Sequence, residues 1–322
     1  MRDTYTSCLA VLLTALVARA GEPPVDQDGR PLIQKRGTIA VDIVENSPVV
    51  FKDRLYLFMG RHEFHFVDYE TGRKTTPFTS GYFGNAFVEG DTVYVTVAAA
   101  GPEVKLFTSQ DLEHWQSQTV LDLPGYGIYN TSICKADDKY VMMFEIGEPK
   151  EEAGHAFTAR FATSPDLEHW TLTPPECNYS KDRYTAPHAL RWLDGDYYDF
   201  YLEHIRGEPY ESHGYEMYVV RSKDLIHWEM SPLNPVLRAS PDDRKLANPD
   251  FTDDERQRIA TAKNLNNSDL DFCEHRGRVI LVYSWGNQLG VEHLAEAVYD
   301  GSLKQFLRGW FPEKKHAKTE NK

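Results

Sequence analysis

Beyond its first 20 residues, the sequence lacks any apolar run close to the roughly 18 residues that a membrane-spanning helix requires. The one leading apolar stretch, residues 8–18, is too short to span a bilayer. It follows Arg2 and precedes Ala18-Arg19-Ala20, which is the layout of a cleavable secretory signal. We therefore expect residues 1–20 to be a signal peptide. The mature protein is then secreted or periplasmic, and a membrane is not its partner.

Basic residues and cysteines are also scarce. The chain carries 35 Lys and Arg residues against 49 Asp and Glu residues, a formal net charge of -14. Such an acidic surface repels a phosphate backbone, which argues against nucleic acid as a partner. Of the four cysteines, only Cys134, Cys177 and Cys273 lie outside the leader, and three cannot all pair. No disulfide framework is therefore expected to hold the fold.

What the sequence does contain is a repeated outer turn of the form S-x-D-L-x-H-W. Its three copies are 109–115, 164–170 and 222–228, and their first residues are 55 and 58 positions apart. Each copy follows an alternating, strand-like stretch, which predicts a tight turn after a strand. The Asp can accept hydrogen bonds from turn amides, while the Leu and Trp pack beneath. We therefore assign these tryptophans to packing and not to a binding site.

A second repeat consists of a polar start, a few apolar positions, a turn of Asp, Gly or Lys, and a β-rich strand. Each copy predicts a hairpin. A stacked sandwich or a barrel would account for the strands but would not require five similar units. The sequence therefore predicts an all-β fold, a five-bladed β-propeller that forms a single domain over residues 21–322. The five copies span 45–58, 85–97, 130–145, 187–203 and 267–284.

One segment, at about 230–263, breaks this period. It contains four prolines, and then Thr252-Asp253-Asp254-Glu255, which forms a capping box at the start of a helix. We expect a loop with one short helix. Because long insertions in compact domains are often functional, we expect it to lie over one face of the propeller.

The hairpins and outer turns resemble the five-bladed β-propeller glycosidases, which include the family 43, family 32 and family 117 enzymes. The resemblance covers residues 41–311, and residues 264–301 resemble a divergent bacterial subgroup. It implies three carboxylates around a pocket at one end of the central channel. In family 43 these are a base Asp that begins the first blade, an Asp in the third and an acid Glu that begins the fourth.

Only one of these three family positions carries over. Aligning residues 54–58 with the matching family strand places Glu45 at the base position. The third blade offers Tyr129 or Asn130, and the fourth offers Thr185 or Ala186 before Pro187. The family 43 triad is therefore not present intact.

Glycoside cleavage needs one carboxyl group to protonate the leaving oxygen and another to act as base or nucleophile. We predict five catalytic residues on the inner parts of the blades. The alternatives are a turn-capping role for Asp269 and Asp271, a structural or orienting role for His188, and ion pairs of the two strand-end glutamates with Arg61 or Arg206. The five residues are Glu45, Glu145, Glu203, His188 and Asp269.

Substrate binding is predicted for polar residues at the strand starts, for two rim residues and for an aromatic platform. Asn267, Asp269 and Asp271 are expected to alternate onto one face of a strand. Tyr82, Phe83, Tyr126 and Tyr129 accompany Trp285 in the platform, because rings can lie against the apolar face of a sugar. The binding residues are Asn46, Arg61, His62, Asn85, Asn130, Asn267, Asp271 and Trp285.

No cofactor is expected to be required, although a structural calcium or sodium ion could lie in the central channel. Arg61-His62-Glu63-Phe64-His65 does not match the H-E-x-x-H zinc motif. The sequence thus favours a secreted glycoside hydrolase that acts on a plant or algal oligo- or polysaccharide. A non-catalytic carbohydrate-binding propeller is the main alternative, and a phosphorolytic or transferring enzyme ranks third. The oligomeric state is left open.

Overall fold

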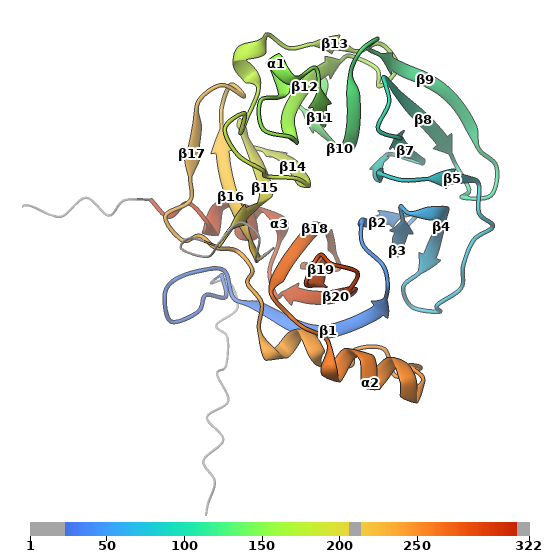
Figure 1. Cartoon of the computed structure of the whole chain (residues 1–322), viewed down its shortest axis with the longest axis vertical. Helices are drawn as coiled ribbons and strands as arrows, with labels where there is room; N and C mark the ends of the chain where they lie inside the picture. The colour runs from blue at the N-terminus through green and yellow to red at the C-terminus, as the bar shows by residue number, and fades with distance from the viewer. Residues whose placement is uncertain (1–22, 206–213, 314–322) are drawn as a thin grey trace, which may run out of the picture.

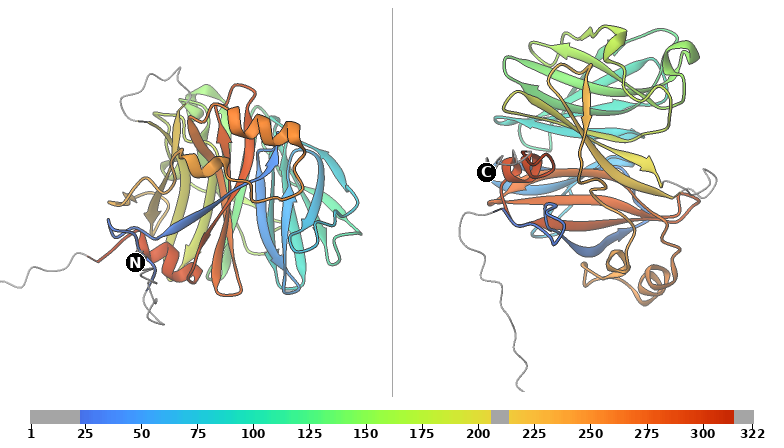
Figure 2. Two further views of the ribbon diagram at one scale, coloured as in Figure 1. Left: turned by 90° about the horizontal axis from the view of Figure 1, so that it is seen from below. Right: turned by 90° about the vertical axis from the view of Figure 1, so that its left-hand side faces the viewer.

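The computed structural model describes residues 23–205 and 214–313. The predicted signal peptide, residues 1–20, and Arg206 lie outside these residues. Five four-stranded antiparallel sheets are arranged radially around a central channel (Figure 1). The strands run along the channel, as the side views in Figure 2 show. The predicted five-bladed β-propeller is confirmed.

The blades follow one another in chain order. Blade I is formed by β2 (Asn46–Phe51), β3 (Arg54–Met59), β4 (His62–Asp68) and β5 (Thr79–Gly81). Blade II is formed by β6 (Gly84–Glu89), β7 (Thr92–Ala98), β8 (Glu103–Ser109) and β9 (Gln116–Asp122). Blade III is formed by β10 (Gly127–Ala136), β11 (Lys139–Glu148), β12 (Thr158–Ser164) and β13 (Thr171–Leu172). Blade IV is formed by β14 (His188–Leu193), β15 (Asp196–His204), β16 (Tyr215–Ser222) and β17 (Trp228–Met230).

Blade V combines the two ends of the described chain. It is formed by β18 (Asn266–His275), β19 (Arg278–Gly286) and β20 (Glu292–Tyr299), and its outermost strand is β1 (Ile33–Val41). β1 pairs antiparallel with β20, with Ile33 opposite Tyr299. The ring is therefore closed by hydrogen bonds between the first and the last described strands.

The five predicted hairpins are the first two strands of each blade. In each blade the first strand is innermost, and the second pairs with it in antiparallel register. Most residues of β11 and β19 are buried, on both faces of the strand. This pattern arises because a neighbouring blade covers each face of a second strand, so the apolar runs in the sequence are continuous there.

The S-x-D-L-x-H-W motif forms the turn between the third and fourth strands of blades II, III and IV. In the first copy, Asp111 Oδ1 accepts hydrogen bonds from the amides of Glu113 (2.9 Å) and His114 (2.8 Å), and Ser109 Oγ accepts one from Leu112 (2.8 Å). The leucine has φ near 66° and is buried. The other two copies repeat these bonds, so the predicted role of the turn is confirmed.

The tryptophan of each outer turn packs in the wedge between its own blade and the preceding one. Trp115 stacks on Phe78 with the ring centroids 3.9 Å apart, and Trp228 stacks on Phe161 of blade III at 6.0 Å. Trp170 packs in the core between blades II and III. Between blades IV and V, α3 (Leu303–Gly309) supplies Phe306 in place of a tryptophan.

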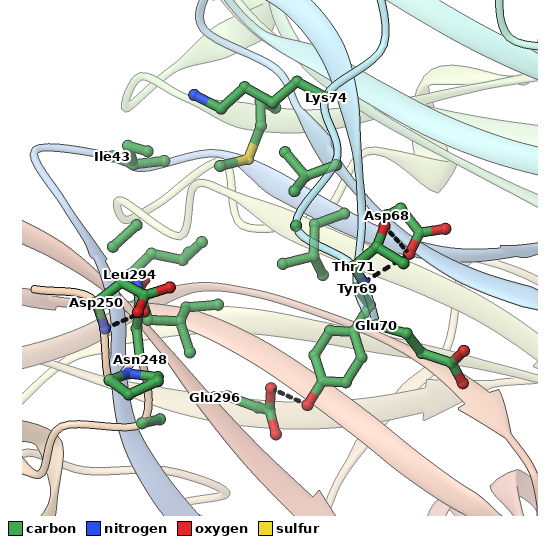
Figure 3. Close-up of a pocket in the computed structure, with 18 of the residues that line it drawn as sticks. Ile43, Asp68, Tyr69, Glu70, Thr71, Lys74, Asn248, Asp250, Leu294 and Glu296 are labelled. Carbon is green, nitrogen blue, oxygen red and sulfur yellow. Dashed lines mark hydrogen bonds between the residues drawn. The ribbon is translucent and has the colours of Figure 1, made fainter.

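The wedge between blades V and I has no such aromatic plug among the described residues, because the turn of blade I is Asp68-Tyr69-Glu70-Thr71-Gly72. It remains an open groove of about 880 Å³. Tyr69 donates a hydrogen bond to Glu296 across one end of it, at 2.6 Å (Figure 3). This groove lies at the blade periphery and not at the channel.

The predicted insertion contains two short helices, η3 (Pro241–Arg244) and α2 (Asp253–Thr261). Thr252 and Glu255 form the expected capping box, with the Thr252 hydroxyl accepting from the Glu255 amide. However, α2 lies outside blade V beside β1 and does not cover the channel (Figures 1 and 2). The predicted position of the insertion over one face of the propeller was therefore wrong. Its residues Phe251 and Ile259 are buried in the core of blade V, which holds the insertion beside that blade.

Two further short helices are α1 (Lys150–Ala153) and η1 (Pro175–Cys177). No helix in residues 23–205 and 214–313 is long and apolar enough to cross a membrane.

Candidate active site

A central pocket opens where the innermost strands of all five blades begin. It brings together seven of the predicted residues, which come from the inner strands of all five blades and the loop before β2. Because these residues are as far apart in sequence as positions 45 and 271, only the propeller closure makes them neighbours. The lining residues are Glu45, Asn46, Ser47, Gly84, Asn85, Asn130, Thr131, Pro187, His188, Asp269, Leu270 and Asp271.

Glu45 immediately precedes β2 and has a left-handed backbone with φ of 59°. Such a conformation is unfavourable for Glu and is maintained here by the surrounding structure. The Glu45 carbonyl accepts a hydrogen bond from the Gly60 amide at 3.2 Å. Burial, and then the nearby Asp269 carboxylate, raise the pKa of Glu45 to about 7, while Arg61 and a backbone hydrogen bond from Phe83 oppose the rise.

Asp269 lies in a β-bulge of β18, between Ser268, which pairs with Ser284, and Asp271, which pairs with Val282. Its φ of 50° is again left-handed. A bulge redirects side chains, and this one turns Asp269 into the pocket. Burial raises the pKa of its carboxyl, and a hydrogen bond from Ser268 and the charge of Arg61 oppose the rise.

The same bulge separates Asn267 from the pocket. The prediction that Asn267, Asp269 and Asp271 share one face of the strand was therefore wrong. Asn267 is fully buried within blade V, where its Oδ1 accepts from Lys35 Nζ at 2.7 Å and its Nδ2 donates to Asp243 Oδ2 at 3.3 Å. Trp285 is fully buried as well and donates to Thr38 Oγ1 at 2.9 Å. Neither residue can contact a sugar, which corrects both predictions.

Glu145 is enclosed behind the pocket wall. It is fully buried on β11, the second strand of blade III, and its Oε2 accepts from Asn130 Nδ2 at 3.1 Å. Its other carboxylate oxygen has no partner. Burial raises the pKa of Glu145 well above its ordinary value, and the nearby Glu45 and Asp269 carboxylates raise it further. Glu145 therefore supports the pocket residue Asn130 from behind.

Glu203 does not join this cluster. Thr131 and His188 both line the pocket, and they pair with Phe144 and Tyr201 respectively. Glu145 follows Phe144 by one position, whereas Glu203 follows Tyr201 by two positions. Because successive side chains of a strand point to alternate faces, the two glutamates point to opposite faces of their strands. The Glu203 carboxylate instead accepts from Arg183 Nε at 3.0 Å. Glu203 thus forms an ion pair, as the alternative expected, but with Arg183 and not with Arg61.

His188 reaches the pocket wall but both of its ring nitrogens are occupied. Nδ1 lies 2.7 Å from Asp199 Oδ2, and Nε2 lies 3.0 Å from Thr185 Oγ1. The His188 and Asp199 side chains are fully buried. This geometry fits the orienting alternative better than proton donation to a substrate.

Three pocket amides and Asp271 complete the wall. Asp271 is paired with Arg191, and its second oxygen lies 3.3 Å from Asn85 Nδ2. Asn46 Nδ2 lies 2.9 Å from the Met59 sulfur, and Asn46 Oδ1 has no partner. Two amide–acid pairs are therefore already bonded, Asn85 with Asp271 and Asn130 with Glu145, whereas Glu45 and Asn46 each retain an oxygen without a partner.

The rim carries the predicted Arg61 and His62. Both are exposed, and both pack against the exposed ring of Tyr82, the guanidinium carbon at 5.9 Å and the imidazole centroid at 5.4 Å. Partly buried rings continue from Tyr82 through blades II to IV. Phe157 and Tyr184 extend the predicted platform and were missed from the sequence. Tyr126 does not belong to this platform, because its hydroxyl donates a hydrogen bond to Glu152. The successive ring contacts join Tyr82, Phe83, Tyr129, Phe157 and Tyr184.

Glu292 is a buried acidic residue that sequence reasoning missed; it does not line the pocket, but the charge of Asp269 acts on it. It begins β20, the third strand of blade V, and both of its carboxylate oxygens are buried, with a backbone hydrogen bond from Gln288 and the charge of Arg61 favouring the ionised form. Burial, and then the Asp269 carboxylate, raise its pKa to about 8. It was missed because candidate acids were sought on inner strands. Its only sequence signal is its position after the turn Gly286–Gly290, at the pocket end of a buried strand.

The described residues contain no group of three or more His, Cys, Asp or Glu side chains arranged to hold a metal ion. In the channel, Asp271 is already neutralised by Arg191. The expectation of a structural calcium or sodium ion in the channel stays a prediction, since such ions also take amide and backbone carbonyl oxygens.

Neither a scan with protein-family models nor a search of curated proteins gives a match. Solved structures do match. A thermostable family-43 glycoside hydrolase has a TM-score of 0.53 and 12% identity, over 85% of this chain and 92% of that chain. An α-L-arabinofuranosidase from Fusarium graminearum, in complex with an iminosugar inhibitor, has a TM-score of 0.52 and 11% identity, over 82% and 97%.

A xylan β-1,4-xylosidase from Bacillus halodurans C-125 has a TM-score of 0.51 and 16% identity, over 82% of this chain and 54% of that chain. Similarity at these identities concerns the fold. The chain is a five-bladed β-propeller similar to those of these glycoside hydrolases.

Proposed function

We propose that the protein is a secreted glycoside hydrolase that acts on a plant or algal oligo- or polysaccharide by carboxylic acid/base catalysis. One observation carries this proposal: Glu45 and Asp269 enter one pocket from different blades, and the Asp269 carboxylate adds to the effect of burial in raising the pKa of Glu45. Two nearby carboxyl groups in a dry site cannot both ionise easily, so one keeps its proton near neutral pH. Glycoside cleavage requires such a pair, in which one carboxyl group is protonated and the other is ionised.

The rim supports a carbohydrate as the ligand. Arg61 and His62 can bind hydroxyl or carboxylate groups, and the row of rings that begins at Tyr82 offers flat apolar surfaces for sugar faces. Because the five inner strands close the pocket on its other sides, a chain end fits better than the middle of a chain. The names of the similar structures, an arabinofuranosidase and a xylosidase, agree with this ligand class.

The test is hydrolysis by the full-length mature protein. The panel contains 4-nitrophenyl α-L-arabinofuranoside, 4-nitrophenyl β-D-xyloside, and oligosaccharides from plant and algal cell walls. Glu45→Gln and Asp269→Asn should each lower kcat/KM by about 100-fold or more, because each removes an acid/base group. Glu113→Gln, in an exposed outer turn, is the matched control and should keep full activity. Unchanged hydrolysis by the Glu45→Gln/Asp269→Asn double variant would contradict the proposal.

A carbohydrate-binding propeller without turnover is the second candidate. It is favoured by blade IV, where the pocket position is occupied by the buried His188–Asp199 pair and not by a free carboxyl group. Binding on a glycan array, together with no released sugar from the bound glycan, would support this alternative over hydrolysis.

Export is proposed from the sequence of residues 1–20. Mass spectrometry of the protein isolated from its native cells should then show a mature N-terminus near residue 21, in the extracellular or periplasmic fraction. A carbohydrate partner outside the cytoplasm would follow.

A further inference from the structure

The groove between blades V and I occupies a place that an aromatic ring fills in the other four wedges. Trp115, Trp170 and Trp228 fill the three wedges from blade I to blade IV, and Phe306 fills the wedge between blades IV and V. Among the described residues, no ring fills the wedge between blades V and I, because Tyr69 lies only at one end of it. One of five equivalent slots is therefore open.

The outer turn of blade I explains the open slot. In blade II, Trp115 directly precedes the residue that pairs with Thr108. In blade I, Gly72 directly precedes the residue whose carbonyl accepts a hydrogen bond from the Asp68 amide, at 2.9 Å. Thr108 and Asp68 hold equivalent positions, because each pairs with the third residue of the second strand of its blade. Gly72 therefore stands where the other outer turns have a tryptophan, and a Cβ added to it would meet no atom within 4 Å.

The groove has the size and the apolar walls of a small-molecule site. Its volume of about 880 Å³ lies within the range of roughly 300 to 1,000 Å³ that is typical of such sites. A flat ring that enters between the two sheets would bury apolar surface on both of its faces, as the tryptophans do in the other wedges. The apolar walls come from β1, β3, β4 and β20 and include Ile39, Ala40, Leu57, Met59, Val67 and Leu294.

The charges along the groove favour an anionic group beside the ring. Three of the four acids that line it already have partners: Asp68 pairs with Arg54, Glu70 pairs with Arg276, and Glu296 accepts from the Tyr69 hydroxyl. The fourth acid is Asp250. The lining cations Lys74 and Arg36 form no ion pair of 4.0 Å or less within residues 23–205 and 214–313. Lys74 is exposed and lies at the end of the groove away from Glu296 (Figure 3).

We propose that the groove between blades V and I binds a small aromatic carboxylic acid. The ring of this ligand takes the place of the missing tryptophan, and its carboxylate pairs with Lys74. The site is separate from the central pocket, because no residue lines both. The inference goes beyond the proposed function and does not depend on it.

The test is isothermal titration calorimetry of the full-length mature protein with indole-3-propionate as the probe. Two analogues separate the ring from the charge: tryptamine keeps the indole but carries an ammonium group, and 3-cyclohexylpropionate keeps the carboxylate but has no aromatic ring. Each analogue should bind at least about 10-fold more weakly than indole-3-propionate. A dissociation constant above about 1 mM for indole-3-propionate would overturn the proposal, as would equal affinities for the three compounds.

Two variants locate the binding site. Ala40→Trp places an indole in the groove from the half-buried position 40 of β1 and should weaken binding of indole-3-propionate by at least about 10-fold. Lys74→Gln should weaken it by about 3- to 5-fold and leave the affinity for neutral indole unchanged, because only an exposed ion pair is lost. Lys139→Gln, an exposed lysine of blade III, is the matched control and should bind like the wild type. Thermal unfolding verifies that each variant is folded, and Lys74→Gln keeps the test valid if Ala40→Trp is not.

Two other occupants of the groove would give different results. If sedimentation shows a wild-type dimer that Ala40→Trp converts to a monomer, the groove belongs to a second copy of the chain. If a tryptophan-containing tripeptide with blocked ends binds more tightly than indole-3-propionate, the groove takes an aromatic side chain of a partner protein. Either result would overturn the assignment to a small aromatic acid, and neither bears on whether the central pocket hydrolyses glycosides.

Discussion

At the scale of single residues, the raised pKa of Glu292 predicts a stability change that does not depend on activity. Its ordinary pKa is 4.5 and its pKa in the folded protein is about 8. Below pH 4.5 the carboxyl is protonated in both states. Between pH 4.5 and about 8 the unfolded state ionises first, so the free energy of unfolding falls as pH rises.

Glu292→Gln cannot ionise and should escape this loss. We expect the variant to match the wild type near pH 4 and to exceed it by roughly 2 kcal/mol at pH 8, after allowance for partial exposure. Urea unfolding at the two pH values measures the difference. A variant less stable than the wild type at pH 8 would show that Glu292 is ionised in a favourable site.

Arg191 and Asp271 form the second residue-scale case. Asp271 is buried in the channel wall, and Arg191 is its cationic partner. Arg191→Met should lower the free energy of unfolding by about 3 to 5 kcal/mol, because it leaves a buried carboxylate unpaired. Adding Asp271→Asn should recover part of that loss, which denaturant unfolding of the double variant can measure. Equal losses in the single and double variants would contradict the pairing.

At the scale of elements, the outer-turn tryptophans are predicted to hold neighbouring blades together. Trp228 stacks on Phe161 and packs with Tyr179, at centroid distances of 6.0 and 5.3 Å. Trp228→Ala should lower the free energy of unfolding by about 2 to 4 kcal/mol, because it opens a cavity in the wedge. The adjacent His227→Ala should lower it by less than about 1 kcal/mol, since the pair of His227 with Asp224 is exposed. Chemical denaturation compares the two, and similar losses would assign the effect to the turn itself.

The elements also explain which parts could be predicted from the sequence. Hairpins and outer turns are local, so alternation and turn residues at fixed offsets were sufficient to identify them. Asn267 was misplaced because the bulge at Asp269 shifts the strand by one position, and alternation alone does not reveal a bulge. Trp285 was misplaced because it is buried under β1, where it donates to Thr38, and this contact depends on the closure of the ring. Glu292 was missed because its proximity to Asp269 depends on the third strand of a blade and on the closure of the ring.

At the scale of the whole molecule, the ring is closed by the pairing of β1 with β20, and a buried polar cluster reinforces this closure. Lys35 of β1 donates to Asp243 Oδ1 and Asn267 Oδ1, each at 2.7 Å. Asp243, in the insertion, also accepts from Tyr283 OH at 2.8 Å. The first strand, the insertion and the last blade therefore meet at one buried carboxylate. Burial lowers the pKa of Lys35, and its pairing with Asp243 opposes the shift.

This closure predicts that Lys35→Met weakens the entire propeller and not only blade V. The substitution leaves the fully buried Asp243 carboxylate without its cation, so the free energy of unfolding should fall by about 3 to 5 kcal/mol. Because Glu45 and Asp269 belong to the two blades that β1 joins, loss of any catalytic activity should follow the same unfolding transition. Circular dichroism, tryptophan fluorescence and residual activity, recorded along one urea series, should give a single shared midpoint. Lys52→Met, at an exposed turn of blade I, is the control and should leave that midpoint unchanged. Separate midpoints for fluorescence and activity would mean that blade V opens independently and that the cluster is not what holds the ring closed.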